Sequence, residues 1–497
     1  MTRLHVDVLV LGAGFGGSLL SAVLAKNGKR VAVVDRGVHP RFAIGESSTP
    51  LADAILKQIA TRYGLQELLP LTQYGSWKRC YSQLRCGVKT GFSYFGHRAG
   101  AAFVPRDQLL VAASNSAMKS DTHWLRSDVD LFLCEYAAKQ GASIVQGADY
   151  FLSGFNEGWC VEGSAEGREF AFVSEFIVDA TGGAGEVLRH LGVAENSDAL
   201  KTNSTALFAH FDGVPTVAAT LAERGVDLQP HPFNCDAAAV HHVLEDGWMW
   251  QLRFDDDTVS AGILVNGDSC TAIRQSEKSL QAVWDDRLKP YAFVASQFTN
   301  ASVVRPQSGL QQTGRLQRIC ERAAGNNWAA LANAAGFVDP LHSTGIAHTM
   351  SCVQRLAAIL LNEAAKPRTE SLRRYSDDLL SEIRLVDEMV EGCYAALPGF
   401  RLWSDWCMLY FAAVTSAEQS PVGNEPTSFL RASDSRFRSM LAEARQRLQR
   451  VIDLDRDERA ISGFEEWLRA AIGPWNHVGL MDDSVNGMYR STAAPDR

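Results

Sequence analysis

The sequence lacks several features that would place it in common protein classes. Its ten cysteines include no Cys-x-x-Cys pair and no His/Cys spacing typical of metal ligands, so neither a zinc site nor a disulfide framework is expected. No apolar run of about 18 residues could span a bilayer, and no block of basic residues could bind nucleic acid at a net charge of −9. A strand predicted within the first ten residues leaves no room for a signal peptide. We therefore expect a cytoplasmic protein that binds no metal, membrane or nucleic acid.

A glycine-rich turn near the N-terminus carries the clearest motif. Gly12-Ala13-Gly14-Phe15-Gly16-Gly17 follows a buried strand and precedes a segment with apolar residues at helical spacing. Gly12 permits a tight turn, Gly14 lets the backbone approach a pyrophosphate, and Gly17 lets the helix pack closely on the strand. Asp35 ends a second strand about twenty residues later, where a carboxylate accepts hydrogen bonds from ribose hydroxyls. The motif predicts a dinucleotide-binding βαβ unit, which fits either NAD or FAD.

Two later glycine turns favour FAD as the dinucleotide. Thr181-Gly182 follows another buried strand, and Gly336-Phe337-Val338-Asp339 follows the segment 328–335. Flavoproteins of the para-hydroxybenzoate hydroxylase type are similar in returning to their cofactor at two such places. That resemblance implies that Asp339 binds the ribityl chain and that Arg126 lies near the ADP or ribityl portion. Alternatively, Asp339 is only a turn residue before Pro340, and Arg126 is an ordinary surface arginine.

Length and pattern predict more than one lobe. The chain has 497 residues, of which 46% are hydrophobic and 21% charged, as in large folded proteins. Buried strands alternate with aromatic and β-branched segments, and the later sequence has a helical rhythm. We expect an α/β fold with an FAD-binding Rossmann-like lobe at 1–75, 100–200 and 300–365. A substrate-binding β-sheet lobe is expected at 76–99 and 201–299, and a helical C-terminal lobe at 366–497.

Three further segments resemble motifs of the flavin-dependent halogenases. They are Pro40-Arg41-Phe42-Ala43-Ile44-Gly45-Glu46-Ser47-Ser48-Thr49-Pro50, then Gly247-Trp248-Met249-Trp250, and finally Gly336 to Gly345. Residues 87–94 and 400–406 are most similar to the branch that acts on free phenols, to which phloroglucinol halogenases belong. The resemblance implies FAD used as FADH2, a halide ion and a small aromatic substrate. It also implies cofactor contacts from Phe15, Glu46, Ser47, Ser48 and Thr49.

The resemblance assigns chemical roles to three large side chains. In such enzymes, reduced flavin and O2 convert chloride or bromide to hypohalous acid at a distance from the organic substrate. Lys89 is implied to carry that oxidant, by hydrogen bonding to it or by becoming a haloamine. The alternative is an exposed strand lysine with its ammonium in water. Trp248 and Trp250 are implied to separate the substrate from the flavin, although tryptophans two apart on a strand also fit core packing.

Two places depart from the motifs of the family, and a third is implied to bind the halide through backbone N–H groups. Leu252-Arg253 stands where the halogenase motif continues with Ile-Pro. His342 occupies a sequence position close to that of a glutamate in the motif of tryptophan-type enzymes. It is expected to act as a base, to bind a phenolate, or to be a structural histidine. The backbone N–H groups of Thr344 and Gly345, near a helix start, are implied to bind the halide.

The leading hypothesis is FADH2-dependent halogenation of a small phenolic or electron-rich aromatic compound. Because no second nucleotide fingerprint supplies a reductase domain, a separate NAD(P)H:flavin reductase is expected as a partner, and a homodimer is left open. The main alternative is a flavin-dependent monooxygenase or dehydrogenase on the same scaffold, which Leu252-Arg253 and His342 favour. A third reading is a flavin-binding or scaffolding protein without turnover.

Overall fold

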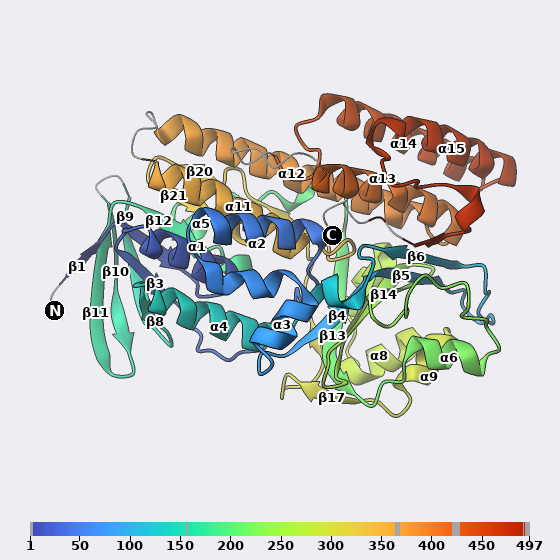
Figure 1. Cartoon of the computed structure of the whole chain (residues 1–497), viewed down its shortest axis with the longest axis horizontal. Coiled ribbons are helices and arrows are strands. Elements are labelled where there is room, and N and C mark those ends of the chain that lie inside the picture. The colour runs from blue at the N-terminus through green and yellow to red at the C-terminus, as the bar shows by residue number, and fades with distance from the viewer. Residues whose placement is uncertain (1–2, 156–157, 363–367, 420–427, 491, 493–497) are drawn as a thin grey trace.

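The computed structural model describes residues 3–155, 158–362, 368–419, 428–490 and 492. The molecule is elongated, with the N-terminal lobe at one end of its long axis and a second lobe at the other end (Figure 1). The C-terminal helices lie along one side of the second lobe (Figure 1).

The first lobe is built around a mainly parallel six-stranded sheet. Its strands lie in the order β20-β21-β12-β2-β3-β8, and β20 pairs antiparallel with β21 while the other neighbours pair in parallel. They are β2 (Val8–Leu11), β3 (Val31–Val34), β8 (Ser143–Val145), β12 (Ile177–Asp179), β20 (Ala324–Gly325) and β21 (Trp328–Ala330). β2 and β3 contain only Val, Leu and Ala and are buried throughout, as in parallel sheets covered on both faces. The predicted Rossmann-like lobe is confirmed.

Helices and a smaller sheet pack against this central sheet. α1 (Phe15–Lys26) links β2 to β3 and packs against α4 (Arg126–Lys139) and α11 (Thr344–Leu361). α11 also contacts α2 (Pro50–Arg62), whose N-cap is Thr49. A four-stranded sheet consists of β1 (Leu4–Val6), β11 (Arg168–Ser174), β10 (Gly158–Ala165) and β9 (Asp149–Phe155). It lies at the N-terminal end of the molecule (Figure 1).

The second lobe is a mostly antiparallel sheet of nine strands. Their order is β17-β13-β16-β15-β14-β5-β6-β23, and β18 (Gln311–Gln312) pairs with β13. The strands are β17 (Ser302–Arg305), β13 (Ser204–Asp212), β16 (Val259–Asn266), β15 (Gly247–Arg253), β14 (Ala239–Val243), β5 (Gly91–Gly96), β6 (Gln108–Ala112) and β23 (Met488–Tyr489). Leu207, Ala209 and Phe211 of β13 pack with the helices α6 (Val217–Glu223), α8 (Leu280–Leu288) and α9 (Ala292–Phe298). Ala206 and Phe208 face the other way, into the main core, so this strand is buried on both sides.

Several elements differ from the expected domain boundaries. β6 lies in the range 100–200 expected for the first lobe, yet it pairs with β5 in the second sheet. β17 and β18 fall in the range 300–365 but also join that sheet, and β23 brings the C-terminal segment back to β6. The range 76–99 expected for the second sheet begins inside a helix, because Trp77 lies in α3 (Tyr74–Cys80). Because strand pairing joins segments that are distant in sequence, local patterns did not reveal these memberships.

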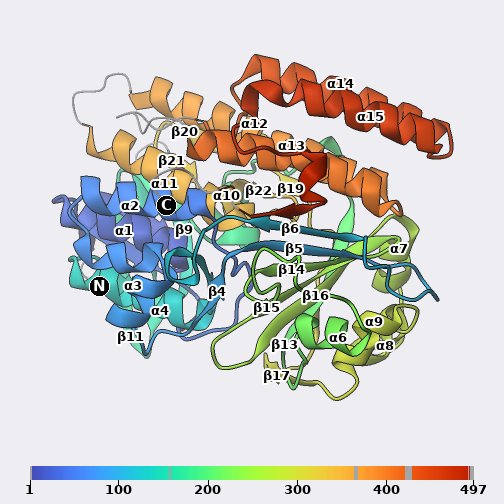
Figure 2. The ribbon, with the colours of Figure 1, turned by 45° about the vertical axis from the view of Figure 1, so that its right-hand side comes forward.

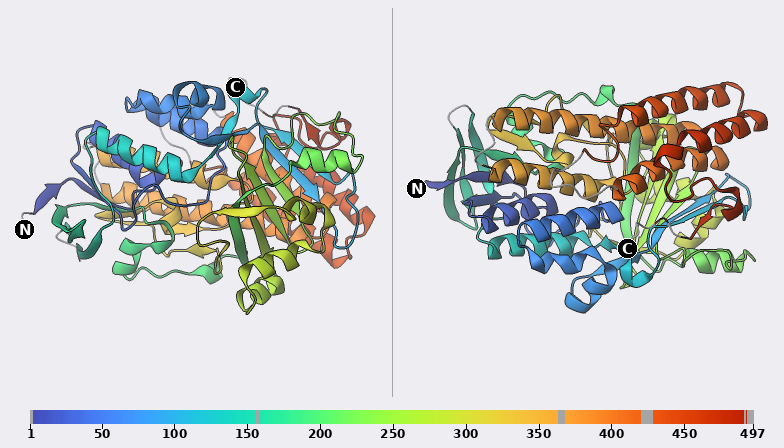
Figure 3. Two further views of the ribbon diagram at one scale, coloured as in Figure 1. Left: turned by 90° about the horizontal axis from the view of Figure 1, so that it is seen from below. Right: turned by 45° about the horizontal axis from the view of Figure 1, so that its top comes forward.

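The C-terminal region consists of long helices, as predicted. α12 (Arg368–Ala396) packs against α13 (Phe400–Glu418), and α14 (Ser435–Asp453) packs against α15 (Glu458–Ala471). Figure 2 shows the α14–α15 pair lying over α12 and α13, which lie next to the second sheet. In Figure 3 the two lobes lie side by side along the long axis. Within the described residues, no helix is both long and apolar enough to cross a membrane.

Candidate active site

A cavity of about 420 Å³ lies at the carboxyl ends of the parallel strands in the first lobe. The residues directly after β2, β3, β12 and β21 all line it, namely Gly12, Asp35, Ala180 and Leu331. Ligands of open α/β sheets bind at this edge, where the strand order changes direction. The N-terminus of α1 also faces the cavity, so its backbone N–H groups and dipole favour an anionic group there.

The three fingerprint glycines of this turn have separate geometric reasons. Gly12 has a φ of +103°, and a Cβ on it would lie 2.4 Å from the Ala180 carbonyl oxygen. A Cβ on Gly17 would lie 2.1 Å from the Gly12 carbonyl oxygen, so α1 could not approach β2 so closely. A Cβ on Gly14 would have its nearest neighbour 3.9 Å away, which leaves the turn open on that side. The turn therefore has the shape that a pyrophosphate needs.

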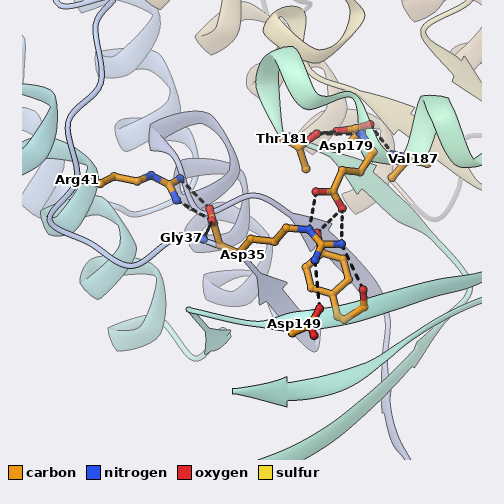
Figure 4. Close-up of polar contacts among 10 residues, drawn as sticks. Asp35, Gly37, Arg41, Asp149, Asp179, Thr181 and Val187 are labelled. Atoms are coloured by element: carbon orange, nitrogen blue, oxygen red, sulfur yellow. Dashed lines mark hydrogen bonds and ion pairs between the residues drawn. The ribbon is translucent and has the colours of Figure 1, made fainter. Parts of the chain in front are cut away.

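Asp35 holds this turn together through four donors. Its Oδ2 accepts a 2.6 Å hydrogen bond from the Ala13 backbone N–H. Its Oδ1 accepts one of 2.7 Å from the Gly37 backbone N–H (Figure 4). Arg41 donates to both oxygens, at 2.6 and 2.8 Å. Burial acts to raise the pKa of Asp35, but the bonds from Arg41 and the backbone outweigh it and lower the pKa. Binding of ribose hydroxyls by Asp35 remains a prediction, and Arg41 is a neighbour that the motif did not reveal.

A second polar cluster lines the same cavity and was not predicted. Arg36 lies 4.1 Å over the ring of Tyr150 and forms a 3.0 Å ion pair with Glu186. The Tyr150 hydroxyl donates to Glu186 at 2.7 Å, and burial raises the pKa of this phenol far above its usual range. Asp179 accepts hydrogen bonds from Thr181 and from the Val187 backbone N–H, which fixes the Thr181-Gly182 turn (Figure 4). No short motif joins these segments in the sequence.

A second cavity of about 150 Å³ adjoins the first. Phe15, Arg126 and Asn333 line both cavities, which therefore form one path from the glycine turn to the second sheet. Arg126 is buried at the junction, where it pairs with Asp130 at 2.8 Å and donates to the Ile44 and Gly45 carbonyls. The structure thus places Arg126 inside the molecule and not on its surface. An extended dinucleotide would pass this guanidinium.

The segment 44–49, which we call the strap, borders this path. Glu46 and Ser47 line the second cavity, and Glu46 Oε1 lies 2.8 Å from His210 Nε2. The strap is fixed by backbone bonds to β7 (Asp121–Trp124): Trp124 N–H donates to the Glu46 carbonyl, and Ser48 N–H to the Thr122 carbonyl. The side chains of the other two predicted contacts point elsewhere, because Ser48 bonds Asp53 and Thr49 caps α2.

Asp339 is the centre of a buried polar network at the second cavity. Its Oδ2 accepts hydrogen bonds from the Tyr394 hydroxyl at 2.9 Å and from Ser204 Oγ at 3.1 Å. The same Tyr394 oxygen accepts a 3.1 Å bond from Trp248 Nε1. Burial raises the pKa of Asp339 to about 7, although these hydrogen bonds act to lower it. Tyr394 comes from α12, and the periodicity of that helix gave no sign of this contact.

Trp248, Trp250 and Leu252 form one wall of the second cavity. They alternate along β15 and so share a face, while Met249 packs on the opposite side of the sheet. The Trp250 indole fits over Gly262, where a Cβ would lie 2.1 Å from the ring. Arg253 points away from the wall, and its Nη2 donates a 2.7 Å bond to the Val214 carbonyl. The departure from Ile-Pro therefore leaves an apolar residue, Leu252, at the cavity.

Lys89 ends the strand β4 (Cys86–Lys89), which pairs with β7. Its side chain is fully buried, with 0% exposure, so it is not a lysine whose ammonium lies in water. Its Nζ donates a 2.5 Å hydrogen bond to the Ser48 carbonyl and lies 4.1 Å from the centre of the Phe92 ring. The strap therefore contacts the path through Glu46 and Ser47. It contacts Lys89 through the carbonyl of Ser48.

Aromatic and imidazole rings surround Lys89. The members of this group, which we call the Lys89 cluster, are Lys89, Phe92, Tyr94, His123, His241 and Tyr410. His241 stacks on Tyr94 at 4.6 Å and also lines the second cavity, so the cluster borders the path. Burial lowers the pKa of both His123 and His241 to about 3, with a further contribution from Lys89. Both imidazoles are therefore neutral at physiological pH.

His342 lies on the far side of Tyr410, whose ring stacks on it at 4.2 Å. Its Nε2 is 3.8 Å from Cys393 Sγ, and among the described residues its buried Nδ1 has no hydrogen-bond partner. Burial lowers the pKa of His342 to about 3. The imidazole of His342 is therefore neutral and only weakly basic, and its Nδ1 is available for a hydrogen bond with a ligand.

The predicted halide ligands lie at the start of α11. Thr344 is the first residue of this helix, and the preceding Ser343 has a φ of +53° and makes no side-chain capping bond. The first N–H groups of a helix have no partner within it, so those of Thr344 and Gly345 are available to a ligand. Gly345 lines the second cavity, and a Cβ on it would meet no atom within 4 Å. The site thus has open space beside its donors.

Comparison with known proteins assigns the family. The tryptophan halogenase family model matches residues 98–403, more than half of the chain, and the NAD(P)-binding Rossmann-like domain model matches residues 10–84. Monodechloroaminopyrrolnitrin halogenase PrnC of Pseudomonas fluorescens is 28% identical over 82% of this chain and 70% of its own length. Tetracycline 7-halogenase of Kitasatospora aureofaciens is 27% identical over 82% of this chain and 73% of its own.

The fold is also that of a solved halogenase. The crystal structure of halogenase PltM in complex with phloroglucinol and FAD matches with a TM-score of 0.85 at 23% identity, over 98% of this chain and 99% of that chain. These matches favour halogenation over a flavin-dependent reaction without halide. The chain belongs to the tryptophan halogenase family and is a flavin-dependent halogenase, an oxidoreductase that uses FAD.

Proposed function

We propose that this halogenase acts on a small phenolic or otherwise electron-rich aromatic compound, with chloride or bromide as the halide. One observation carries the proposal. Within the described residues, three buried polar atoms in or next to the Lys89 cluster have no hydrogen-bond partner: Tyr94 Oη, His123 Nδ1 and His342 Nδ1. Unpaired buried polar atoms are costly, so they favour a ligand that carries hydroxyl groups. The surrounding rings favour an aromatic ligand.

The residues that line the two cavities fit FAD in their chemistry. The glycine turn and the N-terminus of α1 would hold the pyrophosphate, and Asp35 would accept from the ribose. Arg126 and Asp339 would lie beside the ribityl chain, and the strap and the wall of Trp248, Trp250 and Leu252 would enclose the ring system. When bound, reduced FAD would supply two of the four electrons that O2 accepts. The halide would supply the other two as it becomes hypohalous acid.

The wall of Trp248, Trp250 and Leu252 would keep the organic substrate away from the flavin. Its two indoles fill one face of β15, and hydrogen bonds from their Nε1 atoms to Tyr394 and Ser260 hold them in place. A wall fixed in this way forces the oxidant to travel to the substrate. Hydroxylation at the flavin is then disfavoured, because the substrate cannot reach it.

The halide would bind at the first backbone N–H groups of α11, and Lys89 would receive the oxidant. A halide at Thr344 and Gly345 is favoured by two N–H donors and the positive end of the helix dipole. Lys89 would hold hypohalous acid by a hydrogen bond, or form an N–X bond with release of water and later pass the halogen to the ring carbon. The substrate ring carbon loses a proton as it gains the halogen.

The protein is expected to depend on a separate NAD(P)H:flavin reductase, since the sequence carries no second nucleotide fingerprint that a reductase domain would supply. The ten cysteines are all free thiols, which fits a reducing compartment such as the cytoplasm. Pairing the protein with any flavin reductase that releases FADH2 should therefore restore turnover.

The substrate class can be tested with purified protein, FAD, a flavin reductase, NADH, O2 and chloride or bromide. A panel of phenols, anilines and tryptophan is offered, and products are identified by mass spectrometry. We expect halogenated phenols whose formation needs halide. Halogenated tryptophan without any halogenated phenol would show that the proposed substrate class is wrong.

Lys89→Ala tests the relay within the same assay. We expect aryl halide formation to fall by at least about a hundredfold, because the oxidant then has no amine to receive it, while NADH consumption through the flavin continues. Lys78→Ala is the matched control. Lys78 lies on α3, where its ammonium pairs with Asp255, and it is not a member of the Lys89 cluster. Wild-type halogenation by Lys89→Ala would exclude this lysine as the carrier.

A further inference from the structure

The hairpin of β4 and β7 places a carboxylate directly opposite Lys89. Its register pairs Lys89 with Asp121 and Gly87 with His123. Residues directly opposite in an antiparallel pair project to the same face, with their Cβ atoms about 5 Å apart. Both Lys89 and Asp121 are 0% exposed. An amine and a carboxyl group therefore project from the same face of this hairpin into the interior.

The same strand connects this pair to the flavin path. Ser47 forms a β-bridge with His123, and the Ser48 N–H donates to the Thr122 carbonyl at 3.0 Å. Lys89 Nζ in turn donates to the Ser48 carbonyl. β4, β7 and the strap thus form one hydrogen-bonded unit, in which Asp121 sits at a fixed place relative to both Lys89 and the cavity wall.

Among the residues that the structure describes, the other members of the Lys89 cluster carry no negative charge. His123 on β7 and His241 on β14 are neutral at physiological pH, because burial lowers the pKa of each to about 3. Phe92 on β5 presents a ring face, and Ser48 a carbonyl oxygen. On α13, burial raises the pKa of Tyr410, with further contributions from the charges of Glu418 and Asp121, so this phenol is also neutral. The nearby Glu46 carboxylate already lies 2.8 Å from His210.

We infer that Asp121 is the positioning residue of Lys89: its carboxylate balances the buried ammonium and holds the amine in the Lys89 cluster. This inference rests on the proposed relay role of Lys89. A buried cation without such a partner would lose its proton or move, because the interior disfavours an isolated charge. Asp121 therefore sets both the place of the Lys89 amine and the pH at which it ionises.

The charge pair can be tested without any activity. Thermal unfolding is measured for wild type, Asp121→Asn, Lys89→Met and the double variant. Breaking a buried pair by removing one partner is more destabilising than removing both, so the double variant should unfold at a higher temperature than Asp121→Asn. Additive effects of the two single substitutions would overturn the inference, whether or not the protein halogenates phenols.

Activity then tests the positioning role, provided that the wild type halogenates a phenol. Asp121→Asn should lower the aryl halide formed per NADH consumed by about 10²-fold, as a misplaced reacting group does. Without the carboxylate the pKa of Lys89 falls, so the limb of the pH–rate profile that reports Lys89 should move to lower pH. Asp121→Glu restores the charge and should recover part of both effects.

A matched control separates this role from a general loss of a buried carboxylate. Asp236 is also buried in the second lobe, where it accepts hydrogen bonds from the Val217 and Ala218 backbone N–H groups. Asp236→Asn should lower the unfolding temperature but leave the pH–rate profile in place. An Asp121→Asn variant with the wild-type profile and yield would overturn the inference, and a wild type inactive on every phenol would instead refute the proposed function.

Discussion

The phosphate end of the site and the Lys89 cluster are built in different ways. Around Gly12, six successive residues and the strand ends next to them supply backbone N–H groups and a shape that tolerates no Cβ at Gly12 or Gly17. The Lys89 cluster instead collects side chains from β4, β5, β7, β14 and α13, which are far apart in the sequence. The first region binds through its main chain, and the second acts through side chains held by packing.

This difference separates binding from chemistry. A backbone cradle can hold any dinucleotide of suitable size, and it recurs in enzymes with unrelated reactions. The reaction type must then come from the side-chain region, where Lys89 is buried and burial keeps His123 and His241 neutral. Substitutions at the two ends should accordingly affect different measurements.

The largest effect is expected from Gly17→Ala at the phosphate end. The new Cβ would lie 2.1 Å from the Gly12 carbonyl oxygen and 3.0 Å from the Ala180 Cβ, so α1 must move away from β2. Overpacking of this kind costs about 1–3 kcal/mol, which corresponds to a loss of FAD affinity of about ten- to a hundredfold. Titration of FAD fluorescence measures this affinity. Gly463→Ala in α15, where a Cβ meets no atom within 4 Å, is the control, and equal affinities in the two variants would contradict the packing role of Gly17.

A smaller effect is expected from Gly262→Ala, which acts on the wall between the two regions. Its Cβ would lie 2.1 Å from the Trp250 ring, so the indole must shift. We expect the yield of aryl halide per NADH to fall several-fold and hydroxylated product to appear, since the substrate can then approach the flavin. Mass spectrometry of the products gives this ratio. Adding Trp250→Phe provides space for the new methyl group and should restore part of the yield; no change in Gly262→Ala would argue against the wall.

The phosphate end could be predicted from the sequence because its signal is local. The order of buried strand, glycine turn and helix fixed the place of Gly12, Gly14 and Gly17, and the returning turn at Thr181-Gly182 indeed lines the same cavity. Arg36, Tyr150 and Glu186 could not be found in this way, because their contacts depend on how β9 and α5 (Glu186–His190) approach the end of β3. Tertiary packing alone creates that cluster.

The Lys89 cluster could be predicted only in part. Similarity to known motifs suggested Lys89, but neither its burial nor its partner across the hairpin followed from periodicity, because Asp121 lies in a short strand among polar residues. The boundary of the second lobe failed for the same reason: β6 and β23 acquire their places by pairing with distant strands. Register between remote segments is what the local pattern does not contain.

Asp339 links the two regions, and its pH behaviour gives a third test. Burial raises its pKa from 3.8 to about 7, so the folded state binds a proton more readily than the unfolded chain does. The free energy of unfolding contributed by this group therefore falls as pH rises from about 4 to about 7. Asparagine has no charge to bury, so wild type should lose stability relative to Asp339→Asn between about pH 4 and about pH 7.

Unfolding temperatures of the protein without FAD measure this difference for Asp339. Tyr394→Phe removes a hydrogen bond that lowers the pKa of Asp339. In that variant the loss of stability should extend to higher pH. A stability difference between wild type and Asp339→Asn that stays constant with pH would show that the carboxyl group titrates as in water.

The smallest effect is expected where the sequence departs most visibly from the family pattern. Arg253 donates from Nη2 to the Val214 carbonyl, outside the wall formed by its neighbours on β15. Arg253→Ala should therefore lower the free energy of unfolding by about 1.5–3 kcal/mol, the contribution of a hydrogen bond that involves a charged group, and leave halogenation at the wild-type level. Leu252→Ala is the contrasting variant, because it shortens the wall itself and should lower the aryl halide yield. Loss of halogenation in a folded Arg253→Ala variant would contradict this expectation. It would show that the end of β15 affects the reaction, so that binding at the phosphate end and chemistry at the Lys89 cluster are not independent.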